Sequence, residues 1–200
     1  QRAGRSGRSV PVLMRKHFLV DFFACFLIPA YTLLFAGSME WFSTNFSVIA
    51  VTGEDHFRGF FLWGVLVGSY FLGVLGAVAQ TLPRRGRRVV WVLTAVGCVL
   101  LAGALLLPYL PEFLPKIARL HVIFAACACV LLMLALLAVI LTGRRRTYEV
   151  YQPLLRVWRW IAGFSGALFL LGGMITTALE VFFILSAVWL ARRLFYLRKI

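Results

Sequence analysis

Acidic side chains are scarce in this 200-residue chain, which contains 7 Asp and Glu residues against 21 Lys and Arg residues. Charged residues of both signs make up only 14% of the sequence, whereas hydrophobic residues make up 62%. A soluble domain cannot hide so much apolar surface in a single core. The low charge content therefore excludes a soluble enzyme and a disordered chain, and it predicts a protein embedded in a lipid bilayer.

Cysteine and histidine are also few, with 4 and 3 copies. No C-x-x-C motif is present, which disfavours a membrane thiol oxidoreductase, and Cys127 and Cys129 would point to different faces of one helix and chelate a metal ion poorly. His17 is expected on the opposite side of the membrane from His56 and His121, which disfavours a two-haem cytochrome. A site for a single haem is not excluded, but no feature of the sequence supports it. The sequence predicts no cofactor and no metal site.

Long uncharged stretches separate the few charges. Because a bilayer core is about 30 Å thick, a helix needs about 20 predominantly apolar residues to cross it. Five stretches meet this requirement, and a sixth, from Val181 to Ala191, is apolar for only 11 residues before Arg192 and Arg193. The sequence predicts an all-α integral membrane protein, an antiparallel bundle of six transmembrane helices in a single domain over residues 17–200. The expected spans lie at about residues 17–37, 57–80, 89–107, 120–143, 157–178 and 179–197.

The basic residues provide a separate test of this number, because short cytoplasmic loops are enriched in Lys and Arg. Four groups, at residues 1–16, 84–88, 144–159 and 192–199, contain 18 of the 21 basic residues. Six spans place all four groups on one side, whereas five spans would place the last group on the other. We therefore expect both termini in the cytoplasm, a basic cytoplasmic arm at residues 1–16, and a location in a bacterial cytoplasmic membrane. Arginines that anchor span ends to anionic headgroups also disfavour nucleic-acid binding.

The longest outer connection, about residues 38–58, has an apolar stretch from Phe46 to Val51 and a polar tip from Gly53 to His56. We expect it to lie along the membrane interface or to fold over the outer ends of the helices. The second outer connection contains three prolines between residues 108 and 115, which stiffen it.

Two further features concern the spans themselves. Pro29 interrupts the first span and is expected to bend it, and Asp21, the carboxylate inside that span, is expected to pair with the arginine-rich inner side. Small residues four apart, such as Gly64 with Gly68 and Ala162 with Gly166, predict close helix contacts. Packing within the chain is favoured over a homodimer motif.

The remaining ionisable side chains gather at the outer ends of the predicted spans. His121 begins the fourth span, Glu180 lies near the predicted turn between the fifth and sixth, and a polar group flanks the start of the second: Glu54, Asp55, His56 and Arg58. A carboxylate beside an imidazole favours its charged form, and together they can perform acid–base chemistry or hold a lipid headgroup. The alternative is that each side chain caps a helix or faces the headgroups.

The candidate catalytic residues are therefore His121, Glu180 and His56. The candidate residues for binding a lipid or another ligand are these three together with Glu54, Asp55 and Arg58.

Three segments resemble a known group of membrane proteins. They are TNFSVIAVTGEDHFRGFFLWGVLVGSYF at Thr44–Phe71, LHVIFA at Leu120–Ala125 and ALEVFF at Ala178–Phe183. They are similar to the Frag1/DRAM/Sfk1 group and to the bacterial six-span proteins of the DUF998 kind, over most of the chain from about residue 17 to residue 197. In that group a His near the start of a middle span and a Glu near the start of the last span recur, matching His121 and Glu180. The resemblance implies a role in lipid handling without a catalytic signature.

The sequence leads to one preferred function and two alternatives. The preferred function is a non-enzymatic multispan protein that binds or organises lipid, or a partner membrane protein, through a polar cleft on its outer side. The first alternative is a lipid-modifying enzyme that uses His121 and Glu180 for acid–base chemistry. The second is a small-solute transporter or channel, which would need a polar path through the midplane. The expected partners are membrane lipids, with another membrane protein or a second copy of the chain as further alternatives.

Overall fold

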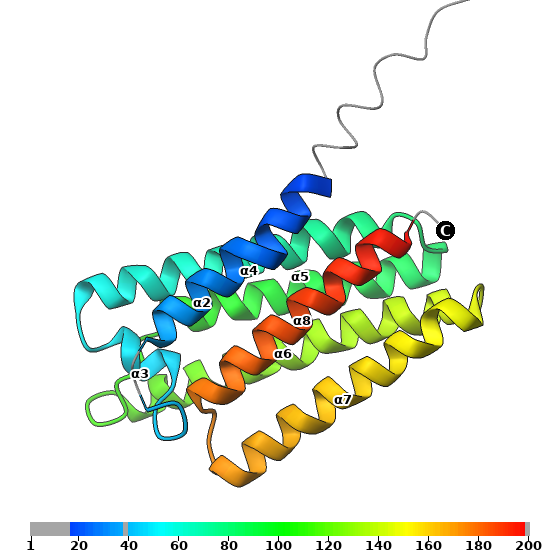
Figure 1. Ribbon diagram of the computed structural model, residues 1–200. Helices are drawn as coiled ribbons and strands as arrows, with labels where there is room; N and C mark the ends of the chain where they lie inside the picture. Colours follow the sequence, from blue (N-terminus) through cyan, green and yellow to red (C-terminus); the bar gives the residue numbers. More distant parts are fainter. Residues whose placement is uncertain (1–16, 38–39, 199–200) are drawn as a thin grey trace, which may run out of the picture.

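The computed structural model describes residues 17–37 and 40–198, and within these ranges every regular element is helical (Figure 1). The predicted all-α class is confirmed, while the basic arm at residues 1–16 lies outside the described residues. A helical stretch at residues 17–22 continues through a π-helical turn into the first α-helix, and six further α-helices follow. These are η1 (Phe23–Leu27), α2 (Ile28–Ala36), α3 (Phe46–Ala50), α4 (Glu54–Ala79), α5 (Arg84–Leu106), α6 (Pro115–Arg144), α7 (Tyr148–Gly172) and α8 (Thr177–Leu197).

Five helices are long and apolar enough to cross a membrane, judged by length and composition alone: His17–Ala36, α4, α5, α6 and α7. The molecule is therefore compatible with an integral membrane protein. The C-terminal helix α8 is 21 residues long but contains Glu180, Arg192 and Arg193, which lower its apolar content. At about 1.5 Å per residue it still measures about 31 Å, close to the thickness of a bilayer core.

The long helices run alternately in opposite directions and form one bundle. The short helix α3 lies at one end of this bundle, beside the ends of the long helices (Figure 1). Several helices begin before the predicted spans, most clearly α6 at Pro115 rather than near residue 120 and α7 at Tyr148 rather than near residue 157. Helix α5 begins at Arg84, because its charged first turn continues the helical hydrogen bonding beyond the apolar stretch. Helix α7 ends at Gly172 rather than near residue 178, because Gly173 adopts a left-handed conformation with φ of 62°. Thr176 then caps α8, and its hydroxyl accepts a hydrogen bond from the Leu179 N–H.

The first span is irregular just before Pro29. Proline has no N–H to donate to the carbonyl four residues earlier, and its ring crowds that carbonyl. The helix widens there into the π turn η1, and the Ile28 N–H bonds to the Phe23 carbonyl oxygen, five residues back. The helix is continuous from His17 to Ala36 and its irregularity takes the form of a widened turn, while the predicted bend stays a prediction.

The first and last helices are joined near the C-terminal end of α8. The Arg192 guanidinium donates from Nε to Oδ1 of Asp21 over 2.7 Å, and the Tyr196 hydroxyl donates to Oδ2 over 2.6 Å. Asp21 thus pairs with a residue of the arginine-rich end, as predicted from the sequence. A charge-assisted bond of this kind is stronger than one between neutral groups.

Helix α4 is the best covered of the five long apolar helices and packs against α2, α3, α5 and α8. Its larger polar side chains find partners on these neighbours. The Trp63 indole donates to the Thr32 hydroxyl over 3.0 Å, and the Tyr70 hydroxyl donates to the Val188 carbonyl over 3.1 Å. By contrast α7 lies at the edge of the bundle, and a Cβ placed on Gly163 or Gly166 would meet no other atom within 4 Å.

Gly64 is the position where the close approach of α4 and α5 requires glycine. A Cβ built there would overlap the Leu105 side chain, which is itself only 3% exposed. The predicted helix contact at Gly64 is present, whereas a Cβ on Gly166 would meet no neighbouring helix among residues 17–37 and 40–198.

Replacing Gly64 by Ala is expected to destabilise the protein because the buried Leu105 side chain has little room to move. Overpacking of this kind costs about 1–3 kcal/mol. In detergent-solubilised protein, the thermal unfolding midpoint should fall for Gly64→Ala and should not fall for Gly166→Ala, which adds the same atom against open space. Combining Gly64→Ala with Leu105→Ala should relieve the overlap. Equal effects of the two glycine substitutions would contradict the close α4–α5 contact.

Candidate functional site

The short helix α3 folds over the ends of the long helices and inserts its apolar side into the core. Phe46 is fully buried, and its ring packs edge-on against Phe35 and Trp63 with centroids 5.2 and 5.0 Å apart. The Asn45 side chain begins the helix by accepting a hydrogen bond from the Val48 N–H over 2.9 Å. Of the two arrangements expected for this outer connection, the structure has the one in which it covers the helix ends.

The beginning of α8 holds the segment that leads into α3. The first N–H groups of a helix have no partner within the helix. Here Thr177 N–H donates to the Thr44 carbonyl over 2.7 Å, and Ala178 N–H donates to the Trp41 carbonyl over 2.9 Å. The loop carbonyls therefore satisfy the start of α8, and this pairing fixes the loop against the last helix.

Glu180 holds the first residue of α3 from the same side. Its Oε2 accepts a hydrogen bond from the Phe46 N–H over 2.7 Å. A carboxylate is well placed at the start of a helix, where unpaired N–H groups carry partial positive charge. Glu180 therefore acts as an anchor for α3 that comes from another helix.

His121 holds the next residue of α3 from the opposite side. Its Nδ1 lies 2.8 Å from both the Ala104 and the Leu107 carbonyl oxygens at the end of α5. Carbonyl oxygens only accept hydrogen bonds, so Nδ1 carries the proton. In the neutral imidazole Nε2 is then an acceptor, and the Ser47 hydroxyl donates to it over 2.7 Å. The imidazole is only 2% exposed and lies between the rings of Phe60 and Tyr109.

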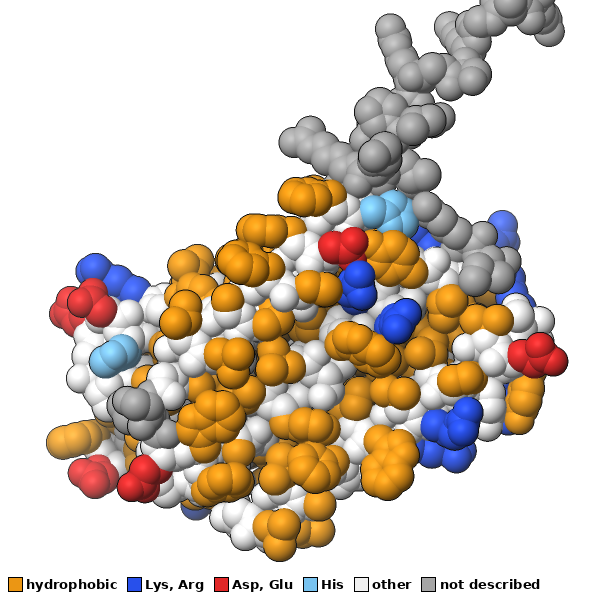
Figure 2. All heavy atoms as spheres, in the orientation of Figure 1, with side chains coloured by type: hydrophobic (Ala, Val, Ile, Leu, Met, Phe, Trp, Pro, Cys, Tyr) orange, Lys and Arg blue, Asp and Glu red, His pale blue; other side chains and the backbone are white. Residues whose placement is uncertain are grey.

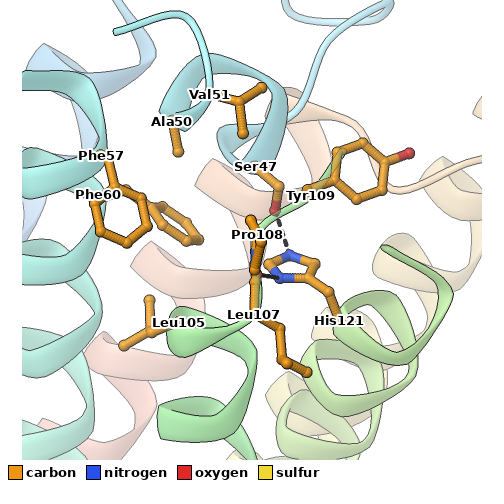
Figure 3. Close-up of a pocket in the computed structure, with 10 residues that line it drawn as sticks. All are labelled: Ser47, Ala50, Val51, Phe57, Phe60, Leu105, Leu107, Pro108, Tyr109 and His121. Atoms are coloured by element: carbon orange, nitrogen blue, oxygen red, sulfur yellow. Dashed lines mark hydrogen bonds between the residues drawn. The ribbon is translucent and has the colours of Figure 1, made fainter. Parts of the chain in front are cut away.

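A pocket opens beside Ser47 and His121, with about 210 Å³ of empty space that includes its open mouth. Its wall comes from α3, the start of α4, the end of α5 and the α5–α6 connection, and most of its side chains are apolar. Figure 3 shows the Ser47 hydroxyl directed at the imidazole, while the Tyr109 hydroxyl points away from the pocket. The hydroxyl and imidazole therefore form a polar spot in an apolar wall.

The six predicted site residues fall into two groups. His121 and Glu180 both bond to α3, at the adjacent residues Ser47 and Phe46, but these two side chains, both in the described part of the chain, form no hydrogen bond with each other. The other four lie in the first turns of α4 and are exposed: Glu54, Asp55, His56 and Arg58.

The α4 group makes only local contacts. His56 shares a hydrogen bond of 2.9 Å with the Thr52 hydroxyl, and Arg58 lies 4.0 Å from Asp55, at the outer limit for an ion pair. In the described ranges 17–37 and 40–198, these side chains do not contribute to the pocket wall, and no group of three His, Cys, Asp or Glu side chains could hold a metal ion.

Ser47 is the residue that sequence reasoning missed. The order Asn45-Phe46-Ser47 before an apolar stretch is a helix-start signal that predicts α3. The partner of Ser47, however, lies 74 residues away in the chain. No local pattern carries information about such a contact.

No family model, curated protein or solved structure matches this chain. The resemblance suggested by its sequence stays a prediction, and the function is argued from the residues themselves.

Replacing Glu180 by Ala removes the acceptor of the Phe46 N–H and is expected to loosen α3. Leaving a buried N–H without a partner costs about 1–3 kcal/mol, so amide hydrogen exchange over residues 44–52 should accelerate about fivefold or more. Glu180→Gln keeps an oxygen acceptor and should give a smaller increase. Glu54→Ala, an exposed carboxylate at the start of α4, is the matched control and should change nothing there. Unchanged exchange in Glu180→Ala would show that this bond does not hold α3.

Proposed function

We propose that the chain is an integral membrane protein with six spans and cytoplasmic termini, in which α8 is the sixth span. Three observations support this topology. Helix α8 is long enough, it packs alongside α2 and α4, and its arginines lie at the same end of the bundle as those of α5 and α6. Figure 2 shows acidic side chains near α3 and Lys and Arg concentrated toward the other end. Under the positive-inside rule, the end that carries α3 is then the outer end.

In this orientation, the protein binds a membrane lipid at its outer end, beneath α3. The observation that carries this proposal is the small, open hollow at the helix ends, whose wall is apolar except for a polar spot at Ser47 and His121. A hollow of this kind fits one segment of a lipid lying against the protein rather than a whole enclosed ligand. An acyl chain matches the apolar wall, and an ester or hydroxyl group of the lipid matches the polar spot.

The site is also firmly shaped, which favours binding of one class of ligand. Helix α3 is fixed through Phe46 on one side and Ser47 on the other, so the roof of the pocket does not need to be ordered by the ligand. A preformed site avoids the entropic cost of ordering a loop on binding. The exposed Glu54, Asp55, His56 and Arg58 lie at the start of α4, at the level expected for lipid headgroups. This role agrees with the lipid handling that the sequence resemblance implies.

The proposed topology predicts the side on which reporter proteins function when the chain is expressed in bacteria. A fluorescent protein that folds only in the cytoplasm should fluoresce when fused after Ile200. A phosphatase that is active only outside the cytoplasm should be active when fused within residues 108–115, between α5 and α6. Phosphatase activity at the C-terminus would contradict α8 as a sixth span, whether or not the fusion at the α5–α6 connection is also active.

The proposed lipid site predicts where a photoactivatable phospholipid crosslinks in nanodiscs. Label should appear on peptides covering residues 47–60 and 105–109. Val51→Trp introduces a large side chain into the pocket from a residue that is already 40% exposed, and it should lower that labelling about tenfold, which corresponds to about 1.4 kcal/mol. Val99→Trp is the control, because Val99 is 69% exposed on α5 and does not line the pocket. Equal labelling in both variants would contradict a lipid site under α3.

A further inference from the structure

The Ser47–His121 pair has the arrangement of a nucleophile and its base. The two atoms that would exchange a proton, Ser47 Oγ and His121 Nε2, lie 2.7 Å apart. The other ring nitrogen is held 2.8 Å from two backbone carbonyl oxygens, which fix both the tautomer and the orientation of the ring. Such a combination of nucleophile, base and orienting group recurs in unrelated hydrolases. Here main-chain carbonyls occupy the place that a carboxylate takes in a complete triad.

The surroundings fix the direction in which the imidazole faces. His121 is nearly fully buried, and its ring contacts the aromatic rings of Phe60 and Tyr109. Because Nδ1 is held by the two backbone carbonyl oxygens, Nε2 is the ring nitrogen that faces the Ser47 hydroxyl.

The hydroxyl is accessible while its base is covered. Ser47 is half-buried and lies in the wall of the pocket, so a molecule in the pocket can reach Oγ without displacing His121. The adjacent wall consists of apolar side chains, including Phe57, Phe60 and Leu105. This wall fits the acyl chain of an ester rather than a charged or highly polar substrate.

The Ser47 bond helps to hold α3 and also lies at the edge of the pocket. Helix α3 is held as well by Glu180, by the buried Phe46 ring and by the loop carbonyls that bond to α8. Among these contacts, the Ser47 bond is the one that joins a hydroxyl in the pocket wall to the most buried imidazole of the described histidines.

We propose that Ser47 is a nucleophile, activated by His121, that takes the acyl group from a lipid ester bound in the pocket. This inference rests on the proposed lipid-binding function and adds a chemical step to it. Ser47 Oγ forms a bond to the ester carbonyl carbon as its proton passes to His121 Nε2. The bond between that carbon and the lipid oxygen then breaks, and the departing oxygen takes the proton from Nε2, leaving an acyl-Ser47 and a lipid alcohol.

A second half-reaction restores the enzyme. A water molecule attacks the acyl carbon and gives a proton to Nε2, and Ser47 Oγ leaves and recovers that proton. The products are a fatty acid and the free Ser47 hydroxyl. No electron transfer and no further co-reactant besides water is involved, so the balance is that of ester hydrolysis.

The test uses a long-chain alkyl fluorophosphonate, which reacts with activated serines, on the full chain in nanodiscs. Mass spectrometry should find the phosphonyl group on Ser47, and Ser47→Ala should abolish it. Because a general base contributes about 100-fold or more to such reactions, His121→Gln should slow the labelling by at least that factor. Ser69 is the internal control, because its hydroxyl bonds to its own helix at Leu66, and it should stay unmodified.

A second variant keeps the test valid if His121→Gln does not fold. Ser47→Cys nearly retains the size of the side chain, and its thiol, beside the His121 imidazole, should react with a long-chain iodoacetamide faster than Cys127, which is an exposed free cysteine. Equal rates for the two thiols, or equal phosphonylation of Ser47 and Ser69, would overturn the proposal.

Failure of this inference can be told apart from failure of the lipid site. Photo-crosslinked lipid in the pocket, lost in Val51→Trp, together with an unreactive Ser47, would leave a lipid-binding protein and remove the catalytic step. The absence of both signals would overturn both proposals. Labelling of Ser47 that falls in Val51→Trp but not in Val99→Trp would support the two together.

Discussion

The end of the bundle that carries α3 depends on the way this short helix is held at two adjacent residues. Phe46 is bound through its N–H by a carboxylate of α8, and Ser47 is bound through its hydroxyl by an imidazole of α6. The two bonds approach the short helix from different parts of the bundle, while the Phe46 ring fills the space between them. Without this attachment the segment would have neither a fixed place nor a pocket beneath it, because five residues are too few to form a stable helix alone.

The same requirement, that polar groups away from water find partners, explains the details around α3. At the end of α5 the Leu107 carbonyl oxygen lies within hydrogen-bond distance of the His121 ring, and the Ala104 carbonyl is shared between this ring and the Leu107 N–H. The first N–H groups of α8 face the same problem, and the loop carbonyls of Trp41 and Thr44 solve it. Each connection between helices is thus tied to a neighbouring helix end, which gives a precise shape to a region built mostly of loops.

The helices and their approximate limits follow from composition, because apolar stretches of sufficient length have few other solutions in a membrane. The Asp21–Arg192 pair was also accessible, since a lone carboxylate near an arginine-rich end has an evident partner. The C-terminal limit of α7 could not be predicted in this way, because it depends on a left-handed turn at Gly173, one glycine among many in the sequence. The sequence places His121 and Glu180 near the starts of their helices, but their common attachment to α3 could not be predicted, because it depends on Ser47 and Phe46, which are distant from them in the chain.

The attachment of α3 also bears on the order in which the molecule assembles. The Phe46 amide and its Glu180 partner are separated by 134 positions, so nearly the whole chain must be synthesised before that bond can form. Contacts between distant residues form late because a long loop must first be closed. During synthesis the attachment of α3 therefore stays incomplete until the start of α8 has taken its place, so a segment made early depends on a helix made much later.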